Sequence, residues 1–181
     1  MIITSINRGY SVSIKLLETT PKQNRHYFIA FVIGVITGII SAFVKSGTED
    51  ILPPRTPERI APPVQMLTDM GIDWHSLVYS YSDQLVYWGG NFVHIVFSIV
   101  ATVFYCVVAE IFPRITMLQG IVFGILFAVV CHGVMLPILG LSPAVIHLPV
   151  DEIISEILGT CLWIWSVELL RIALREKMTQ I

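Results

Sequence analysis

Charged residues are scarce in this chain, and their scarcity excludes several classes of protein. Only 13% of the 181 residues are Asp, Glu, Lys or Arg, and 55% are hydrophobic, whereas an average soluble domain contains about 25% charged residues. The formal net charge is −2, so no strongly basic surface is available to neutralise a phosphate backbone. The composition therefore indicates a lipid bilayer as the surrounding partner and argues against nucleic acid.

Cysteine is also rare, and the familiar catalytic motifs are missing. Cys106, Cys131 and Cys161 lie inside apolar runs without the spacing of a zinc site, so we interpret them as small buried hydrophobic residues. The sequence contains no Gly-rich phosphate loop, no Gly-x-Ser-x-Gly elbow and no His-Glu-x-x-His pair. We therefore expect a chain that is not an enzyme and that carries no metal or cofactor.

Long uncharged runs are the main feature that the sequence does contain. A hydrocarbon core of about 30 Å needs about 20 apolar helical residues. The first run lacks an A-x-A site before Lys45, so we do not interpret it as a cleaved export signal. We predict an all-α membrane protein, a four-transmembrane-helix bundle over residues 25–181 behind a tail over residues 1–24. Its spans are residues 27–44, 86–112, 117–140 and 153–170.

The distribution of Lys and Arg predicts the orientation of this bundle. Eight of these residues lie before the first run, between the second and third runs or after the fourth: Arg8, Lys15, Lys22, Arg25, Arg114, Arg171, Arg175 and Lys177. Three lie on the opposite side: Lys45, Arg55 and Arg59. We therefore expect both termini in the cytoplasm and the proline-rich loop 45–85 in the periplasm or cell exterior.

Three of the runs carry small or polar residues at four-residue spacing, which is typical of helices that pack closely in lipid. These residues are Ala30, Gly34, Gly38 and Ala42; Gly90, His94, Ser98 and Thr102; and Gly120, Gly124, Ala128 and His132. We interpret the three stripes as the core of a compact monomer. A homo-oligomer built on the first run is the alternative.

Two histidines lie inside the apolar runs at similar depth. His94 is eight residues from the start of the second run and His132 is eight residues before Gly140, the end of the third. At about 1.5 Å per residue, both lie about 12 Å below the same surface. Glu156 enters the fourth run from that side, with Glu152 one turn above it. The adjoining loop adds three further candidates: Lys45, Glu49 and Arg55.

This group of imidazoles and carboxylates has three physical interpretations. The histidines can be structural, with hydrogen bonds to Ser98 or to a backbone carbonyl of a neighbouring helix. They can form a proton-responsive site, because imidazole changes charge near neutral pH. They can also be ligands, either to a metal together with Glu or to a b-type haem between His94 and His132. Ionisable groups inside a membrane make a functional site the first hypothesis.

Charged residues also close the spans at the opposite end of the predicted bundle. Glu110 ends the second run, and Glu168 and Arg171 lie near the end of the fourth at i,i+3 spacing. Residues of this kind usually act as interfacial anchors or ion pairs. We interpret them as structural and keep them as candidates for the cytoplasmic end.

Three stretches of the chain resemble the YagU family of bacterial inner-membrane proteins. They are residues 41–57, 94–113 and 148–171, of which Tyr105-Cys-Val-Val-Ala-Glu-Ile-Phe-Pro113 and Trp163-Ile-Trp-Ser-Val-Glu168 are the more specific. The resemblance implies a multi-pass protein of the bacterial inner membrane that is associated with survival in extreme acid. It implies no catalytic residue, ligand or substrate. The positions that match the family pattern are Lys45, Glu49, Arg55, His94, Glu110, His132, Glu152, Glu156 and Glu168.

The leading hypothesis from the sequence is an inner-membrane protein that contributes to acid resistance through a periplasm-side cluster of His94, His132, Glu156 and Glu152. The first alternative is a small channel or transporter component for protons, ions or a small solute. The second is a haem-binding electron carrier of the membrane.

Overall fold

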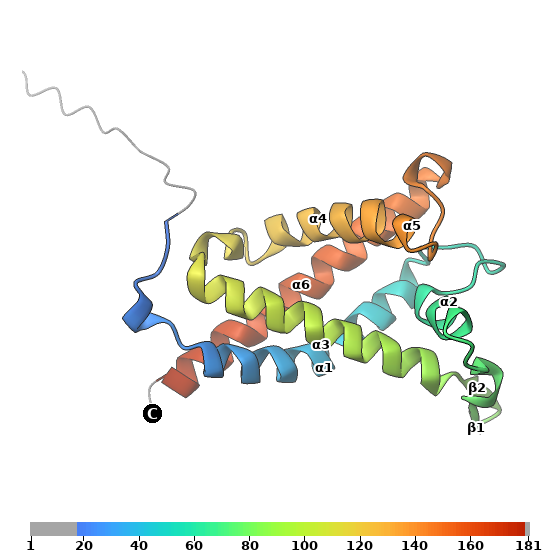
Figure 1. The fold of residues 1–181 in the computed structure, drawn as a ribbon, viewed down its shortest axis with the longest axis horizontal. Helices are drawn as coiled ribbons and strands as arrows, with labels where there is room; N and C mark the ends of the chain where they lie inside the picture. The colour runs from blue at the N-terminus through green and yellow to red at the C-terminus, as the bar shows by residue number, and fades with distance from the viewer. Residues whose placement is uncertain (1–17, 180–181) are drawn as a thin grey trace, which may run out of the picture.

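Long apolar helices make up most of the protein. The computed structural model describes residues 18–179, so most of the predicted tail 1–24 lies outside the described residues. Four helical segments are long and apolar enough to cross a membrane, which confirms the predicted architecture (Figure 1). They are α1 (Tyr27–Ile51), α3 (Trp88–Ile111), the segment Ile121–Ile138 and α6 (Val150–Thr179).

The third segment is composite, and shorter elements join the four spans. It consists of α4 (Ile121–Val130), a π-helical turn (Cys131–Met135) and α5 (Leu136–Ile138). Between α1 and α3 lie the short helix α2 (Pro62–Asp69) and a hairpin of β1 (Tyr79–Tyr81) and β2 (Gln84–Val86), which the sequence analysis did not predict. Single 3-10 turns occupy Lys22–Asn24, Trp74–Ser76, Pro113–Thr116 and Val145–His147.

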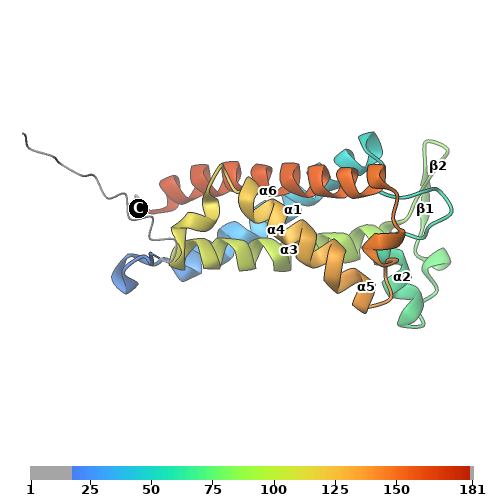
Figure 2. The ribbon, with the colours of Figure 1, turned by 90° about the horizontal axis from the view of Figure 1, so that it is seen from above.

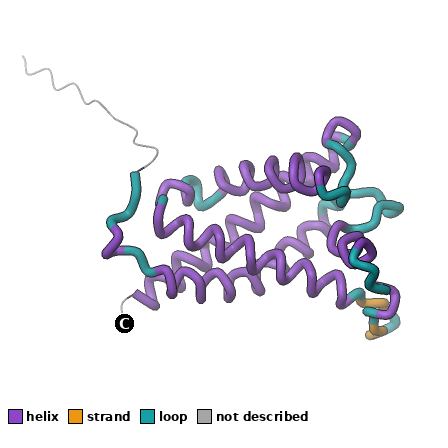
Figure 3. Tube along the Cα trace, viewed as in Figure 1, coloured by secondary structure: helices purple, strands orange, loops and turns teal. Residues whose placement is uncertain are grey.

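The two ends of the bundle differ in what they carry. Helix α2, the hairpin and the connections 52–87 and 139–149 gather at one end, which we call the loop end (Figure 3). The start of the described chain, the turn Pro113–Thr116 and the end of α6 lie at the other, which we call the termini end (Figure 1). The two ends of the described part of the chain, residues 18 and 179, therefore lie on the same side of the bundle, as an even number of spans requires.

Helices α1 and α3 form the closest pair in the bundle because glycines let their backbones meet. A Cβ atom added at Gly34 would lie 2.5 Å from Val103 Cα, and one added at Gly38 would lie 2.5 Å from Thr102 Oγ1. Thr102 Oγ1 donates to Gly34 O at 2.7 Å, and Ser98 Oγ donates to Gly38 O at 2.8 Å. The stripes of the first two spans thus face each other inside one chain, as close packing in lipid requires.

Helix α6 packs against both α1 and α4, and α4 reaches the bundle mainly through α6 (Figure 2). Gly124 of α4 allows this approach, since a Cβ atom there would lie 3.1 Å from Cys161 Cα. Tyr105, Ile164 and Val167 are fully buried in the core. Large apolar side chains such as Phe31 and Leu126 point outward instead, as expected of helices that contact lipid.

The π-helical turn follows from the chemistry of Pro137. Proline has no N–H to donate and its ring clashes with the carbonyl four residues earlier, which here belongs to Gly133. The helix opens by one residue, so that the Leu136 N–H bonds to Cys131 O. Turns of this kind occur often at functional sites, and this one contains His132.

The close approach of α1 and α3 yields a test of the fold. We expect Gly34→Ala to destabilise the protein by about 1–3 kcal/mol, because the added methyl group overlaps the α3 backbone. Gly47→Ala is the matched control: the space around Gly47 is open, and Ala stabilises a helix by about 0.5–1 kcal/mol relative to Gly. Thermal unfolding in detergent measures both. Equal melting temperatures for the two variants would contradict the described α1–α3 contact.

Candidate functional site

A group of ionisable side chains from three membrane spans and the connection after α1 meets at the loop end. We call Lys45, Glu49, Arg55, His132 and Glu156 the loop-end cluster. Helix α1 continues past the predicted end at Val44 to Ile51, so Lys45 and Glu49 lie one turn apart on it. Lys45 Nζ lies 2.9 Å from Glu49 Oε1 and 3.1 Å from Glu156 Oε2 on α6. One ammonium group therefore joins carboxylates of two spans.

The proline-rich connection after α1 folds back onto this cluster. Arg55 donates to Glu49 Oε2 from Nη1 at 3.1 Å and from Nη2 at 3.0 Å. Its Nη2 also lies 4.0 Å from Glu156 Oε1. Four residues farther along, Arg59 forms an ion pair with Glu152 at the start of α6. Two arginines thus tie the connection to the bundle through carboxylates on α1 and α6.

The two histidines contact different partners. His132 Nε2 lies 3.3 Å from Glu156 Oε2, so His132 belongs to the cluster. His94 Nδ1 lies 3.3 Å from Ser46 Oγ, beside Lys45. Glu152, which the sequence hypothesis grouped with the histidines, contacts Arg59 instead. The structure therefore brings together four of the sequence candidates with His132, namely Lys45, Glu49, Arg55 and Glu156, and places His94 next to them.

Charge is balanced and largely shielded from solvent at the loop end. Lys45, Arg55 and Arg59 face an equal number of carboxylates, those of Glu49, Glu152 and Glu156. The Lys45 side chain is 7% exposed and that of Glu156 is 14% exposed. Ionic interactions strengthen where water is excluded, but an unpaired charge there is costly. The ionisable groups of three spans therefore contact one another in a poorly solvated position.

A cavity of about 570 Å³ lies beside the cluster. Its lining includes the polar side chains of Lys45, His94 and His132 and the apolar side chains of Phe97 and Trp163. Its volume falls within the range of about 300–1,000 Å³ that is typical of small-molecule sites. The cluster thus has space next to it rather than being closed in by packed side chains.

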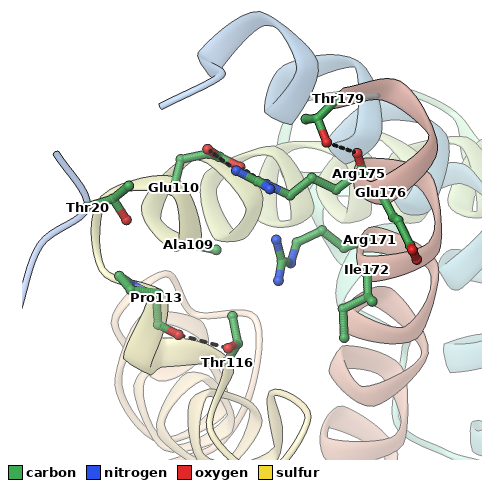
Figure 4. Close-up of a pocket in the computed structure, with 10 residues that line it drawn as sticks. All are labelled: Thr20, Ala109, Glu110, Pro113, Thr116, Arg171, Ile172, Arg175, Glu176 and Thr179. Atoms are coloured by element: carbon green, nitrogen blue, oxygen red, sulfur yellow. Dashed lines mark hydrogen bonds and ion pairs between the residues drawn. The ribbon is translucent and has the colours of Figure 1, made fainter. Parts of the chain in front are cut away.

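Two carboxylates at the termini end, Glu168 and Glu110, each join helices through hydrogen bonds or ion pairs. Glu168 on α6 accepts from Tyr105 Oη of α3 at 2.9 Å and from Arg171 Nε at 2.6 Å. Glu110 accepts from Arg175 Nε at 2.5 Å and from the His26 N–H, at the start of α1, at 3.1 Å. Glu110, Arg171 and Arg175 also line a pocket of about 540 Å³ (Figure 4). We interpret these pairs as clamps that join α1, α3 and α6.

The geometry offers little to a metal or a haem. Within residues 18–179, no three His, Cys, Asp or Glu side chains lie close enough together to hold a metal ion. Haem ligation would need both histidines turned toward a common iron. His94 Nδ1 instead faces Ser46, and His132 Nε2 faces Glu156. The haem hypothesis therefore draws no support from the described arrangement.

Several partners at both ends were not among the sequence candidates. They are Ser46, Arg59, Tyr105, Thr160 and Arg175. Arg59 and Arg175 pair with carboxylates 93 and 65 residues away, and no local pattern reports contacts of that range. Thr160 follows Gly159, and two adjacent small residues within an apolar run could have marked a position of close helix packing.

The sequence of the chain is similar to that of known proteins. A family described as "Protein of unknown function (DUF1440)" matches residues 39–169, a range that includes the whole loop-end cluster. The chain is also similar to "Inner membrane protein YagU" of Escherichia coli (strain K12), at 38% identity over 192 residues. The alignment covers 92% of this chain and 94% of that protein. No solved structure matches the chain.

The shared use of Lys45 by two carboxylates yields a stability test. We expect Lys45→Met to destabilise the protein by about 3–5 kcal/mol, because it leaves Glu156 with a buried and poorly compensated charge. In the double variant Lys45→Met/Glu156→Gln that charge is also removed. We expect it to be more stable than the sum of the single changes implies, by about 1 kcal/mol or more. Thermal unfolding of all four proteins measures the coupling, and strictly additive changes would contradict the pair.

Proposed function

This chain belongs to the DUF1440 family and is a multi-pass protein of the inner membrane, and from that premise we propose that it contributes to acid tolerance through the loop-end cluster. The association with acid comes from the resemblance to the YagU family. The observation that carries the proposal is the contact of His132 with Glu156. Glu156 is also paired with Lys45, which in turn is paired with Glu49. The proposal involves no catalysis.

Acid would change the charge of the cluster in one direction only. Imidazole gains a positive charge as the pH falls through the neutral range, and the carboxylates lose theirs at lower pH. The groups that face the histidines or share their cavity are Lys45, Glu49, Asp50, Arg55, Glu58, Arg59 and Glu156. A region in which the paired charges balance at neutral pH would therefore become positive in acid, with like charges held in a poorly solvated space.

Loss of the carboxylate charges would release the connection after α1. Arg55 is held by Glu49 and Arg59 by Glu152, so protonation of these two carboxylates removes both attractions. Repulsion between imidazolium and Lys45 would add to this effect. We propose that the connection then moves away from the bundle and exposes the cavity, a local charge change with a structural readout.

A second candidate is a small channel or transporter component for protons, ions or a small solute. The cavity beside the cluster favours it, because transport sites also lie inside helix bundles. Ile33, Tyr105 and Ile164 fill the bundle beyond the cavity in this conformation, so passage would need a rearrangement. Flux into proteoliposomes under an imposed pH gradient tests this candidate, and flux no higher than in empty vesicles would remove it.

The proposal requires the loop end to face the periplasm. We expect the variant Ser80→Cys, in the hairpin, to react with a membrane-impermeant maleimide in intact cells. The variant Thr116→Cys, at the termini end, should react only after the inner membrane is permeabilised. The background for both replaces Cys106, Cys131 and Cys161 with Ala. The reverse labelling pattern would place the cluster on the cytoplasmic side and contradict the proposal.

Cell survival after a severe acid challenge tests the function itself. Cells that lack the native gene would carry the wild-type protein, His132→Gln, Glu156→Gln or, as a matched control, His75→Gln in the exposed turn Trp74–Ser76. We expect the two cluster variants to give survival close to that of cells without the gene, because the group that responds to protons is lost. His75→Gln should protect as the wild type does. Immunoblots of membrane fractions check abundance.

A direct measurement separates proton sensing from general envelope integrity. A nitroxide label at Thr56→Cys, in the connection, reports mobility by electron paramagnetic resonance. We expect mobility to rise as the pH falls from about 7.5 to about 4, because the imidazoles and then the carboxylates gain protons, and to rise less in His132→Gln. Full protection of cells by every cluster variant, with no pH dependence of the label, would return these residues to a purely structural role.

A further inference from the structure

Thr160 on α6 has a buried hydroxyl group that the rest of the structure leaves unused. Its residue is 1% exposed, and within residues 18–179 its Oγ1 is a buried side-chain oxygen without a hydrogen-bond partner. A threonine in a helix normally donates to a carbonyl three or four residues earlier. Buried polar groups rarely stay unpaired, since the missing bond is unfavourable. Thr160 lines the cavity of about 570 Å³ at the loop end, so a molecule in that cavity could supply the partner.

Part of the cavity wall is apolar and lies between elements that diverge. Its walls there come from α3, α4, the π-helical turn and α6 and include Phe97, Phe127, Cys131 and Trp163. Phe97 and Phe127 meet across α3 and α4 with ring centroids 6.3 Å apart. From this contact α3 and the α4–α5 segment spread apart toward the loop end (Figure 1). The result is an aromatic-walled space near one unpaired hydroxyl group.

The charges around the cavity argue against a charged occupant. Lys45, Arg55 and Arg59 are each already held by carboxylates, so an anion would have to break an existing ion pair. The cavity's further acidic groups, Asp50 and Glu58, are exposed and would repel an anion as well. A cationic group beside Thr160 would meet the ammonium group of Lys45 as a like charge, and the nearest carboxylate, Glu156 one turn earlier on α6, is already paired with that ammonium group.

We propose that this cavity binds a small, uncharged and largely apolar molecule whose single hydroxyl or carbonyl group hydrogen-bonds to Thr160. The aromatic walls provide the contact area and Thr160 provides orientation, as in typical ligand pockets. This inference goes beyond the proposed function and does not depend on it. Thr160→Val leaves every ion pair of the loop-end cluster intact, so failure of one proposal is distinguishable from failure of the other.

The test uses bromine as a quencher of Trp163 fluorescence. The protein, in lipid nanodiscs, retains Trp163 alone after Trp74, Trp88 and Trp165 are changed to Phe. Four probes share one ring and differ in their polar group: 4-bromophenol, bromobenzene, 4-bromobenzoate and 4-bromobenzylammonium. We expect 4-bromophenol to quench saturably and unbrominated phenol to relieve the quenching. The two charged probes should bind at least about tenfold more weakly, because their burial is uncompensated.

Variants assign the binding to this cavity. Thr160→Val keeps the shape of the side chain and removes the hydroxyl group. It should weaken 4-bromophenol about fivefold, the effect of one typical hydrogen bond, and leave bromobenzene unchanged. Val93→Phe, which fills the cavity, should abolish saturable quenching by both probes. Thr116→Val, at the termini end, is the matched control and should bind as the unmodified protein does.

Three results would overturn the proposal. One is quenching that does not saturate or that Val93→Phe leaves unchanged, since this would report partition into lipid only. Another is tighter binding of the ammonium or carboxylate probe, which would make the site one for ions. The third is quenching of Trp163 by a phospholipid with brominated tails that phenol does not relieve, which would identify the occupant as a bilayer acyl chain.

Discussion

The ammonium group of Lys45 is the contact on which the loop end depends. An isolated charge at this depth would be strongly unfavourable, yet Lys45 is almost fully buried because Glu49 and Glu156 lie within 3.1 Å of it. Gly159 makes the approach possible, since a Cβ atom there would lie 3.3 Å from Lys45 Nζ. Once Lys45 lies against α6, Glu156 is positioned to meet His132 and Glu49 to hold Arg55. The proline-rich connection is thereby attached to the bundle.

Features that depend on one helix face could be predicted from the sequence. Uncharged length located the four spans, and the small-residue stripes identified the faces of α1 and α3 that meet at Gly34 and Gly38. The ends of the helices could not be located in this way. The charge of Lys45 ended the first apolar run, but the helix continues to Ile51 because that charge is neutralised by partners from α6 and from α1 itself. Such neutralisation depends on the tertiary structure, which hydropathy along the chain does not report.

The candidate site was predictable in composition and not in connectivity. The sequence predicted His94 and His132 at equal depth and Glu156 on the same side of the membrane, and His132 and Glu156 do meet. Depth does not predict which side chains face each other around the bundle. The contacts of His94 with Ser46 and of Glu152 with Arg59 were therefore not predicted.

The hairpin between α1 and α3 was also not predicted. Its turn uses Ser82 and Asp83 with φ of 50° and 60°, whereas the usual sequence signal is Asn-Gly or Asp-Gly. The two ends then differ in kind, since Glu110 and Glu168 clamp helices while the loop-end charges border an apolar cavity.

The π-helical turn before Pro137 determines which residues of the third span share one face of the helix. An α-helix advances about 100° per residue, so the extra residue between Cys131 and Met135 rotates everything after it by about that angle relative to an uninterrupted helix. Without this turn, side chains that precede it and side chains that follow it would not face the interior of the bundle together. Exchange of Pro137 for another residue would therefore change which side chains before and after His132 face the interior together with it. The presence of that histidine in a relative's sequence is then informative only together with the proline five positions later.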